Sequence, residues 1–262
     1  MKRPTIRTAV ALLGAAIISP TVLTAQDNCE LREEKVLTEK AGESLRLQAG
    51  AGKLVITGRS GIDYVRVDAT LCASDRERMD ALDVSLDEGK LDTDYPRNGS
   101  SGWFGRNRYA RIDLVVQVPA GMSLRVDDSS GSVEITGVGD VDLRDGSGSM
   151  RLRSVASAVV EDGSGSLRIE DVAGDVTVED GSGLLRIRGV GGDVVISDGS
   201  GSIEVGAVGG TVRVNGGGSG SVTVRDVDGD LVVTDTRRSR IRFSDIRGVL
   251  DLPPEKRKGR GR

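Results

Sequence analysis

Five aspartates recur at nearly constant spacing, and each one heads a copy of an Asp-x-Ser-Gly sequence. They are Asp128, Asp145, Asp162, Asp180 and Asp198, so that each follows the one before by seventeen or eighteen positions. If each copy begins one turn of stacked β-strands, neighbouring carboxylates lie about 4.8 Å apart and repel by about 0.9 kcal/mol even in water. The structure must therefore contain something that offsets this repulsion.

Two kinds of partner could offset it. The first is an Asx turn, in which each carboxylate accepts hydrogen bonds from the Ser and Gly amides that follow it. The second is bound calcium, as in solenoids built from nonapeptide repeats with the pattern Gly-Gly-x-Gly-x-Asp. Because the register of aspartate and glycine differs here, the Asx turn is the favoured interpretation and a calcium ladder is the alternative. No cofactor is expected.

The chain contains no histidine, which narrows the possible chemistry. It cannot form a Ser-His-Asp triad or a histidine-ligated metal centre. Carboxylates alone can cleave glycosidic bonds, and some polysaccharide-cleaving enzymes are β-helices. In this chain, however, the carboxylates repeat along ladders and do not converge on one place. The sequence therefore predicts a protein that is not an enzyme and has no catalytic residues.

One short segment concentrates the aromatic residues. Four of the six aromatic side chains lie between positions 95 and 109, with arginines among them. Exposed tyrosine and tryptophan beside arginine suit the face of a sugar or a protein partner. Alternatively, the rings fold back as an apolar plug over one end of the molecule. The candidate ligand or partner loop comprises Tyr95, Arg97, Trp103, Phe104, Arg106, Arg108 and Tyr109.

A row of arginines is a second basic feature. Arg151, Arg168 and Arg186 occupy equivalent positions in successive repeats, between Glu134 and Glu204. Such a row could bind an anion, but opposite charges on adjacent strands are also typical of an ordinary solvated sheet. The bordering glutamates favour the solvated face.

A sequence repeat of about 18 residues positions the aspartates and the row of arginines. Each repeat from residue 128 onward holds two stretches of alternating apolar and polar residues, separated by corners rich in glycine and serine. Alternation sends one set of side chains inward, and stacked turns bury columns that one turn cannot bury alone. The expected columns are Val133-Met150-Leu167-Leu185-Ile203-Val222-Ile241, Ile135-Leu152-Ile169-Ile187-Val205-Val224-Phe243, Val141-Ala158-Val176-Val194-Val212-Leu231-Leu250, Leu143-Val160-Val178-Ile196-Val214-Val233-Leu252 and, at a corner, Val138-Val155-Val172-Val190-Val208-Val227-Ile246.

The predicted fold is therefore all-β, a single-stranded β-helix or β-solenoid that we expect to be right-handed. Its regular part spans residues 128–252, after an irregular β-rich N-terminal cap with the first turns at 26–127. Within the cap, Ser74–Glu77 fits a capping box before a short helix, and residues 82–95 fit a hairpin. Residues 253–262 are expected to form a basic, disordered tail.

The beginning of the chain has the features of a secretory signal peptide at residues 1–25. Three basic residues precede an apolar run at 9–18, and a cleavage point follows Ala25. We expect an exported protein, in the periplasm, at the cell surface or outside the cell, without a transmembrane segment after cleavage. In an oxidising compartment, Cys29 and Cys72 would form one disulfide worth about 4 kcal/mol. Two unrelated buried thiols are the alternative.

Three sequence features resemble a known bacterial family. They are Gly-Ala-Gly-Lys-Leu-Val-Ile-Thr-Gly at 50–58, Val-Pro-Ala-Gly at 118–121 and the repeated Asp-Gly-Ser-Gly-Ser turns. Together with the signal segment, they are similar to a family of adhesin-like proteins related to the head domains of autotransporter adhesins, over residues 40–252. The resemblance implies a single-chain β-helix exposed in the cell envelope, and it supplies no functional residues.

Two functions fit these observations. The first is a secreted, non-catalytic, adhesin-like binding module of the bacterial envelope. The alternative is a periplasmic structural or regulatory scaffold that recognises another envelope protein. The partner is expected to be an envelope protein or a surface glycan. No nucleic acid is expected, because the net charge of the chain is −4.

Overall fold

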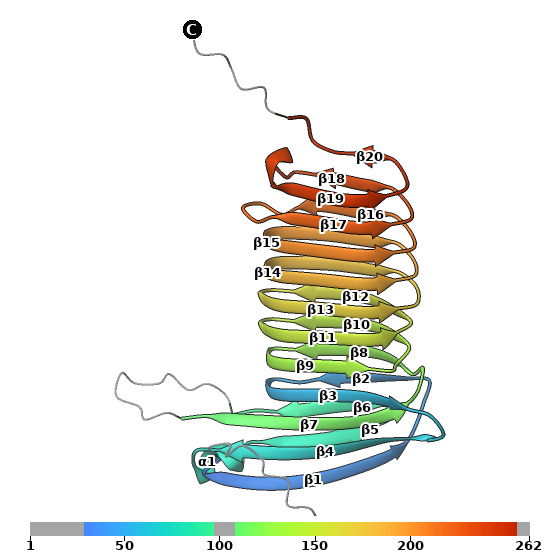
Figure 1. Ribbon diagram of the computed structural model, residues 1–262. Coiled ribbons are helices and arrows are strands. Elements are labelled where there is room, and N and C mark those ends of the chain that lie inside the picture. The colour runs from blue at the N-terminus through green and yellow to red at the C-terminus, as the bar shows by residue number, and fades with distance from the viewer. Residues whose placement is uncertain (1–28, 97–107, 256–262) are drawn as a thin grey trace, which may run out of the picture.

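The computed structural model describes residues 29–96 and 108–255 (Figure 1). The predicted signal segment, the centre of the predicted aromatic loop and most of the basic tail lie outside these residues. The regular secondary structure of the described chain is nearly all β-strand, with one α-helix of four residues and one short 3-10 helix, η1 (Arg238–Arg240). The strands stack along one axis into a rod, and each turn is aligned with the equivalent positions of the next. The prediction of an all-β solenoid with about 18 residues per turn is therefore confirmed.

Antiparallel strands close the N-terminal end of the rod. β4 pairs with β1 on one side and with β7 on the other, and β5 and β6 form the expected hairpin. Glu88 and Gly89 at the hairpin turn have φ angles of 48° and 73°, the left-handed values that a tight two-residue turn requires. The bounds are β1 (Leu31–Lys40), β4 (Tyr64–Ala73), β5 (Asp83–Asp87), β6 (Lys90–Asp94) and β7 (Ala110–Pro119).

The short helix α1 (Arg76–Met79) lies in this cap and buries Met79. Its N-cap residue is Asp75, whose side chain accepts a hydrogen bond of 3.0 Å from the amide of Arg78. The helix is therefore where the sequence predicts it, but it is capped one residue later than the capping box at Ser74 implies. An aspartate is as good an N-cap as a serine, and the negative charge also suits the N-terminal end of the helix.

The strands of the first solenoid turn, β2 and β3, are not stacked in the order in which they occur in the sequence. β2 pairs in parallel with β6 below it and β8 above it, and β3 pairs in the same way with β7 and β9. The chain thus forms this turn first, continues through β4 to β7 in the cap beneath it, and then forms β8 and β9 above it (Figure 1). The returning connection is fixed by the Ala120 amide, which donates to the Arg59 carbonyl at 2.9 Å. The bounds are β2 (Ser44–Gln48), β3 (Ala51–Arg59), β8 (Ser123–Asp128) and β9 (Ser130–Thr136).

Above this turn the solenoid is regular, and each turn places one parallel strand on each side of a thin apolar interior. One face contains β9, β11 (Gly148–Val155), β13 (Gly165–Val172), β17 (Val222–Val227) and β19 (Ile241–Ile246). The other face contains β8, β10 (Asp140–Asp145), β12 (Ser157–Asp162), β16 (Val212–Gly216), β18 (Leu231–Thr234) and β20 (Leu250–Asp251). The longer strands β14 (Val176–Val190) and β15 (Val194–Val208) bend round a corner and belong to both faces.

The predicted inward columns are the core. Strand register aligns Val133, Met150 and Leu167 and continues through Leu185 and Ile203, and all five side chains are almost fully buried. The last turn departs from the prediction, because Leu250 remains 44% exposed. Within the described residues no further turn stacks above the last one, so the inward-facing side chain of Leu250 is not buried by a neighbouring turn on that side.

The corner between the two faces depends on glycine. Gly165 has a φ of 144°, a conformation that only glycine adopts without strain. A Cβ atom at this position would lie 1.9 Å from the carbonyl oxygen of Gly148 in the turn below. Gly148 and Gly183 repeat both the angle and the close approach. The second glycine of each Asp-Gly-Ser-Gly copy is therefore required by how tightly the turns stack.

The two cysteines form the predicted disulfide, Cys29–Cys72, which fastens the start of β1 to the buried end of β4. The bond holds the outermost strand of the cap, whose free edge carries mostly charged residues. Charged edge strands resist pairing with other molecules. Within the described ranges, no helix has the length and apolar character needed to cross a membrane.

Candidate functional site

Two charged features border the glycine corner, and the first is a column of aspartates that point inward. Asp128, Asp145, Asp162, Asp180 and Asp198 are aligned strand to strand by the β-sheet register. The last four are only 5–6% exposed. We call this feature the aspartate column. It ends at Gly216, which is the register partner of Asp198 in the next turn.

The predicted Asx turns are present along the column. The carboxylates of Asp145, Asp162 and Asp180 accept hydrogen bonds from the amide two residues later, at 3.3, 3.0 and 3.0 Å. These bonds stabilise the charged form, but burial disfavours it more strongly. The pKa of Asp162 is raised to about 6, chiefly by burial and then by the neighbouring charges of Asp180 and Asp145. Burial likewise raises the pKa of Asp145 and of Asp180.

The alternative of a calcium ladder gains no support from the geometry. In residues 29–96 and 108–255, no three carboxylate or thiol groups are arranged as ligands of a single metal ion. A calcium ion takes six to eight oxygen ligands, whereas each carboxylate here already accepts from its own turn or faces another aspartate. The calcium ladder stays a prediction.

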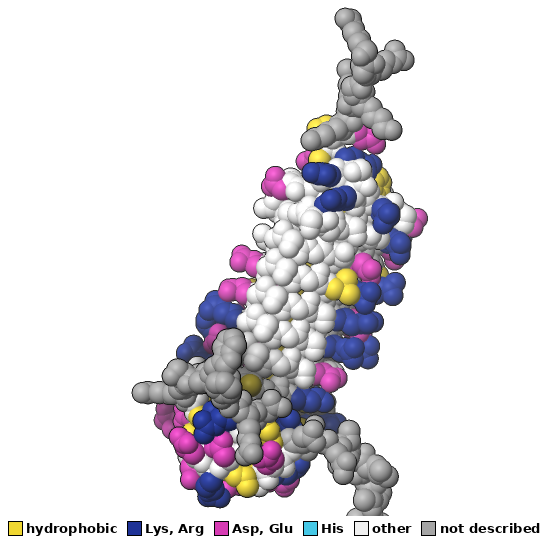
Figure 2. Space-filling view, turned by 90° about the vertical axis from the view of Figure 1, so that its left-hand side faces the viewer, with side chains coloured by type: hydrophobic (Ala, Val, Ile, Leu, Met, Phe, Trp, Pro, Cys, Tyr) yellow, Lys and Arg dark blue, Asp and Glu magenta, His cyan; other side chains and the backbone are white. Residues whose placement is uncertain are grey.

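The second charged feature is an excess of arginine on the face that contains β11, β13 and β17. In the space-filling view, basic side chains gather along the right-hand edge of the rod, beside a pale strip of small residues (Figure 2). We call this the arginine face, and define it by two adjacent outward rows of side chains. The first row is Glu134, Arg151, Arg168, Arg186, Glu204, Thr223 and Arg242, and the second is Thr136, Arg153, Glu170, Arg188, Gly206, Arg225 and Ser244.

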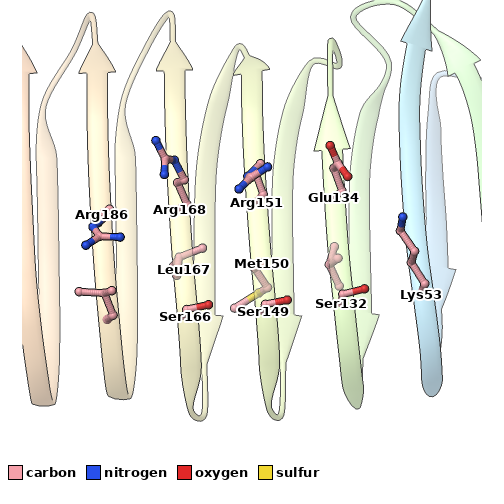
Figure 3. A pocket seen from close by; sticks show the side chains of 12 residues that line it. Lys53, Ser132, Glu134, Ser149, Met150, Arg151, Ser166, Leu167, Arg168 and Arg186 are labelled. Atoms are coloured by element: carbon pink, nitrogen blue, oxygen red, sulfur yellow. The ribbon is translucent and has the colours of Figure 1, made fainter. Parts of the chain in front are cut away.

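The arginine face is grooved. Figure 3 shows Arg151, Arg168 and Arg186 side by side on consecutive strands, over a shallow groove of about 320 Å³. A second groove of about 580 Å³ lies further toward the C-terminal end, and we call it the arginine groove. Its charged lining consists of five arginines and two glutamates, namely Arg168, Arg186, Arg188, Arg225, Arg242, Glu170 and Glu204.

The glutamates neutralise only part of this charge. Arg168 and Arg153 contact Glu170 at 2.7 and 3.0 Å, and Arg186 contacts Glu204 at 2.9 Å. The hydrogen bond from Arg168 is the main reason that the pKa of Glu170 is lowered. Among the described residues, Arg151, Arg188, Arg225 and Arg242 form no ion pair.

The groove on the other side of the corner has the opposite character. It occupies about 690 Å³, and its charged lining consists of the aspartate column, Asp127, Glu161 and Glu179, with Arg144 as its one basic residue in the described chain. The rod therefore carries a basic and an acidic surface separated by a strip of glycine and serine. The sequence interpretation of the arginines as an ordinary solvated face missed this separation.

The described ends of the aromatic loop serve the cap. Tyr95 is half-buried, and its hydroxyl donates to the Ala51 carbonyl at 3.0 Å. Burial raises the pKa of Tyr95 to about 12. The hydroxyl of Tyr109 accepts from the Glu30 amide at 2.8 Å, while Arg108 lies 3.6 Å from Asp75. The remaining predicted loop residues, Arg97, Trp103, Phe104 and Arg106, lie outside the described residues, so their role as plug or ligand site stays a prediction.

The fold and surface define a class of protein, a two-faced parallel β-solenoid with a charged, grooved exterior. The chain belongs to the Toastrack DUF4097 family, whose model matches residues 45–246. This confirms the family resemblance drawn from the sequence motifs. No curated protein matches the sequence.

The chain is similar to several solved structures at low sequence identity. A proposed adhesin from Parabacteroides distasonis is 11% identical, with 84% of this chain and 97% of that chain covered and a TM-score of 0.43. A proposed lipid-binding protein from the same organism is 13% identical, with the same coverage and TM-score. A proposed cell adhesion protein from Clostridium sporogenes is 12% identical, with 85% and 100% covered and a TM-score of 0.36.

Proposed function

We propose that the protein is an exported, non-catalytic, adhesin-like binding module of the bacterial envelope, and that its arginine groove binds an anionic glycan. The observation that carries this proposal is the groove of about 580 Å³ in which five arginines outnumber two glutamates. A guanidinium group matches carboxylate, sulfate or phosphate groups through paired hydrogen bonds. An enzyme would instead need a convergent catalytic group, and the groove offers arginines in rows.

The repeat of the fold suits a repeating ligand. Arg151, Arg168 and Arg186 lie on adjacent strands, about 4.8 Å apart, and Arg188 and Arg225 lie two strand spacings apart in the neighbouring row. A polymer that carries one negative charge per unit can therefore meet several arginines at once, so that weak contacts add up along the chain. Arg188, Arg225 and Arg242 are exposed and have no ion-pair partner among the described residues, which leaves them free to meet such a ligand.

A charge-matched pair of variants tests the proposal. The first variant carries Arg188→Gln, Arg225→Gln and Arg242→Gln in the groove. The control carries Arg125→Gln, Arg144→Gln and Arg213→Gln, which remove the same charge from the opposite face. Binding to immobilised polygalacturonate, heparin and neutral dextran is measured at low and at physiological salt.

We expect the wild type and the control to bind the two polyanions and not dextran, with affinity falling as salt rises. The groove variant should lose at least about tenfold in affinity, which corresponds to about 1.4 kcal/mol. Equal binding by all three proteins would reject the groove as the site. Failure of the wild type to bind any polyanion, with a single envelope protein co-purifying instead, would favour the scaffold function.

A further inference from the structure

We infer that the aspartate column is a proton-binding device, which takes up protons as the pH falls below neutral and thereby stabilises the stack of turns. This inference is independent of the proposed glycan-binding function. It concerns a line of carboxyl groups inside the corner of the rod, on the acidic side of the glycine strip.

The first support is the burial of carboxylate oxygens without partners. Both carboxylate oxygens of Asp198 are buried and have no hydrogen-bond partner among the described residues, and the same holds for Oδ2 of Asp162. Burial and then the charge of Asp180 raise the pKa of Asp198 more than the Ser200 amide lowers it. A buried charge without a partner is strongly unfavourable. A proton on the carboxyl removes the charge and adds a donor that a neighbouring carboxylate can accept.

The second support is the close spacing of adjacent carboxyl groups in the column. Each aspartate is the register partner of the next, so every carboxyl in the interior of the column faces one above and one below. Asp128 and Asp145 lie close enough for their carboxyl groups to share a hydrogen bond. Two carboxyl groups this close share one proton more readily than they carry two charges.

The third support is the absence of a compensating cation. None of the ion pairs between described residues involves a member of the column. The other titratable or charged groups at this corner are Asp127, Glu161, Glu179 and Arg144, which line its outer surface, and the neutral Tyr95, whose pKa is raised by burial and also by the charge of Asp128. Three of these are acidic, so the surroundings favour proton uptake.

The direction of the effect follows from the pKa values. Free aspartate titrates near pH 4, whereas burial raises the pKa of Asp128 to about 7 and that of Asp162 and Asp198 to about 6. Between these values the folded protein binds more protons than the unfolded chain. Stability gained from the column is therefore complete below about pH 4 and is lost as the pH rises to about 7.

The test compares the melting temperature of the full chain at pH 5 and pH 8. We expect the wild type to melt at least about 5 °C higher at pH 5. The variant Asp162→Asn with Asp180→Asn keeps the turn acceptors and removes two charges. It should melt higher than the wild type at pH 8 and show a smaller difference between the two pH values. The matched control, Glu161→Gln with Glu179→Gln, removes two charges from the outward neighbours on the same strands and should keep most of the difference between pH 5 and pH 8, because the buried column itself is unchanged.

Three outcomes would overturn the inference. One is a wild type that melts higher at pH 8 than at pH 5. Another is a rise in its melting temperature on adding CaCl2 at pH 8 that the asparagine variant does not show, because the column would then be a cation site. The third outcome concerns the titration of the wild-type aspartates, which carbon-13 NMR follows even if the asparagine variant fails to fold. Midpoints between pH 6 and 7 are expected for Asp128, Asp162 and Asp198. Midpoints below pH 5 for all three would contradict proton sharing.

Discussion

Gly165→Ala is expected to lower the free energy of unfolding by about 3 kcal/mol or more. Two effects add at this position. The φ angle of 144° is costly for any residue with a side chain. The new methyl group would also lie 1.9 Å from the backbone oxygen of Gly148, and that oxygen belongs to a strand held on both sides. The melting temperature followed by circular dichroism should fall by about 10 °C.

Ser164→Ala is the matched control for this substitution. Ser164 is the neighbour of Gly165 in the same corner, and its backbone amide, which is retained in alanine, is the group that contacts Asp162. Its melting temperature should stay close to that of the wild type. Equal melting temperatures for the two alanine variants would show that the turns are not stacked as tightly as the structure has them.

Leu167→Asp is the second change with a large expected effect. Leu167 is 2% exposed and lies in the middle of an inward column, with Met150 below and Leu185 above. A carboxylate there would be buried among aliphatic side chains without a partner, which costs several kcal/mol. We expect the variant to be unfolded or to lose at least about 4 kcal/mol, as measured by urea denaturation.

Ser166→Asp separates the effect of the position from the effect of the charge. Ser166 precedes Leu167 on β13 and is exposed. Because side chains alternate along a strand, the same aspartate at this position reaches solvent. Its free energy of unfolding should change by less than about 1 kcal/mol. Similar losses from both substitutions would mean that Leu167 does not face the interior.

The sequence was sufficient to predict the regular part of the rod because the inward apolar positions repeat with the same register. The nearly constant offset between successive turns identifies which side chains share a column, and alternation identifies which columns are buried. The Asx turns were predictable for a similar reason, since each depends on residue types at fixed positions in the repeat. The disulfide was predictable because the chain contains two cysteines and an oxidising compartment was expected. Extending that register to the last two turns would have added Arg242 to the arginine row and Arg225 to the row beside it.

The cap could not be predicted in the same way. The turn formed by β2 and β3 lies between strands that come much later in the sequence, and no periodic spacing links them. Alternation shows that Leu54 and Ile56 face inward but not which turn they cover. The charge separation across the glycine corner was missed because it depends on comparing the two faces, whereas the sequence shows each row separately.

The central claim is that successive turns stack in register into one rod, because both the arginine groove and the aspartate column depend on it. Spin labels at Glu134→Cys and Arg242→Cys test this directly, since the two native cysteines are bonded to each other. The two positions lie at the ends of one outward row, six strand spacings apart. Electron-electron distance measurement should give a single narrow distribution near 29 Å, or about 4.8 Å per turn. A broad distribution, or a mean that differs by more than about 10 Å, would contradict the stack.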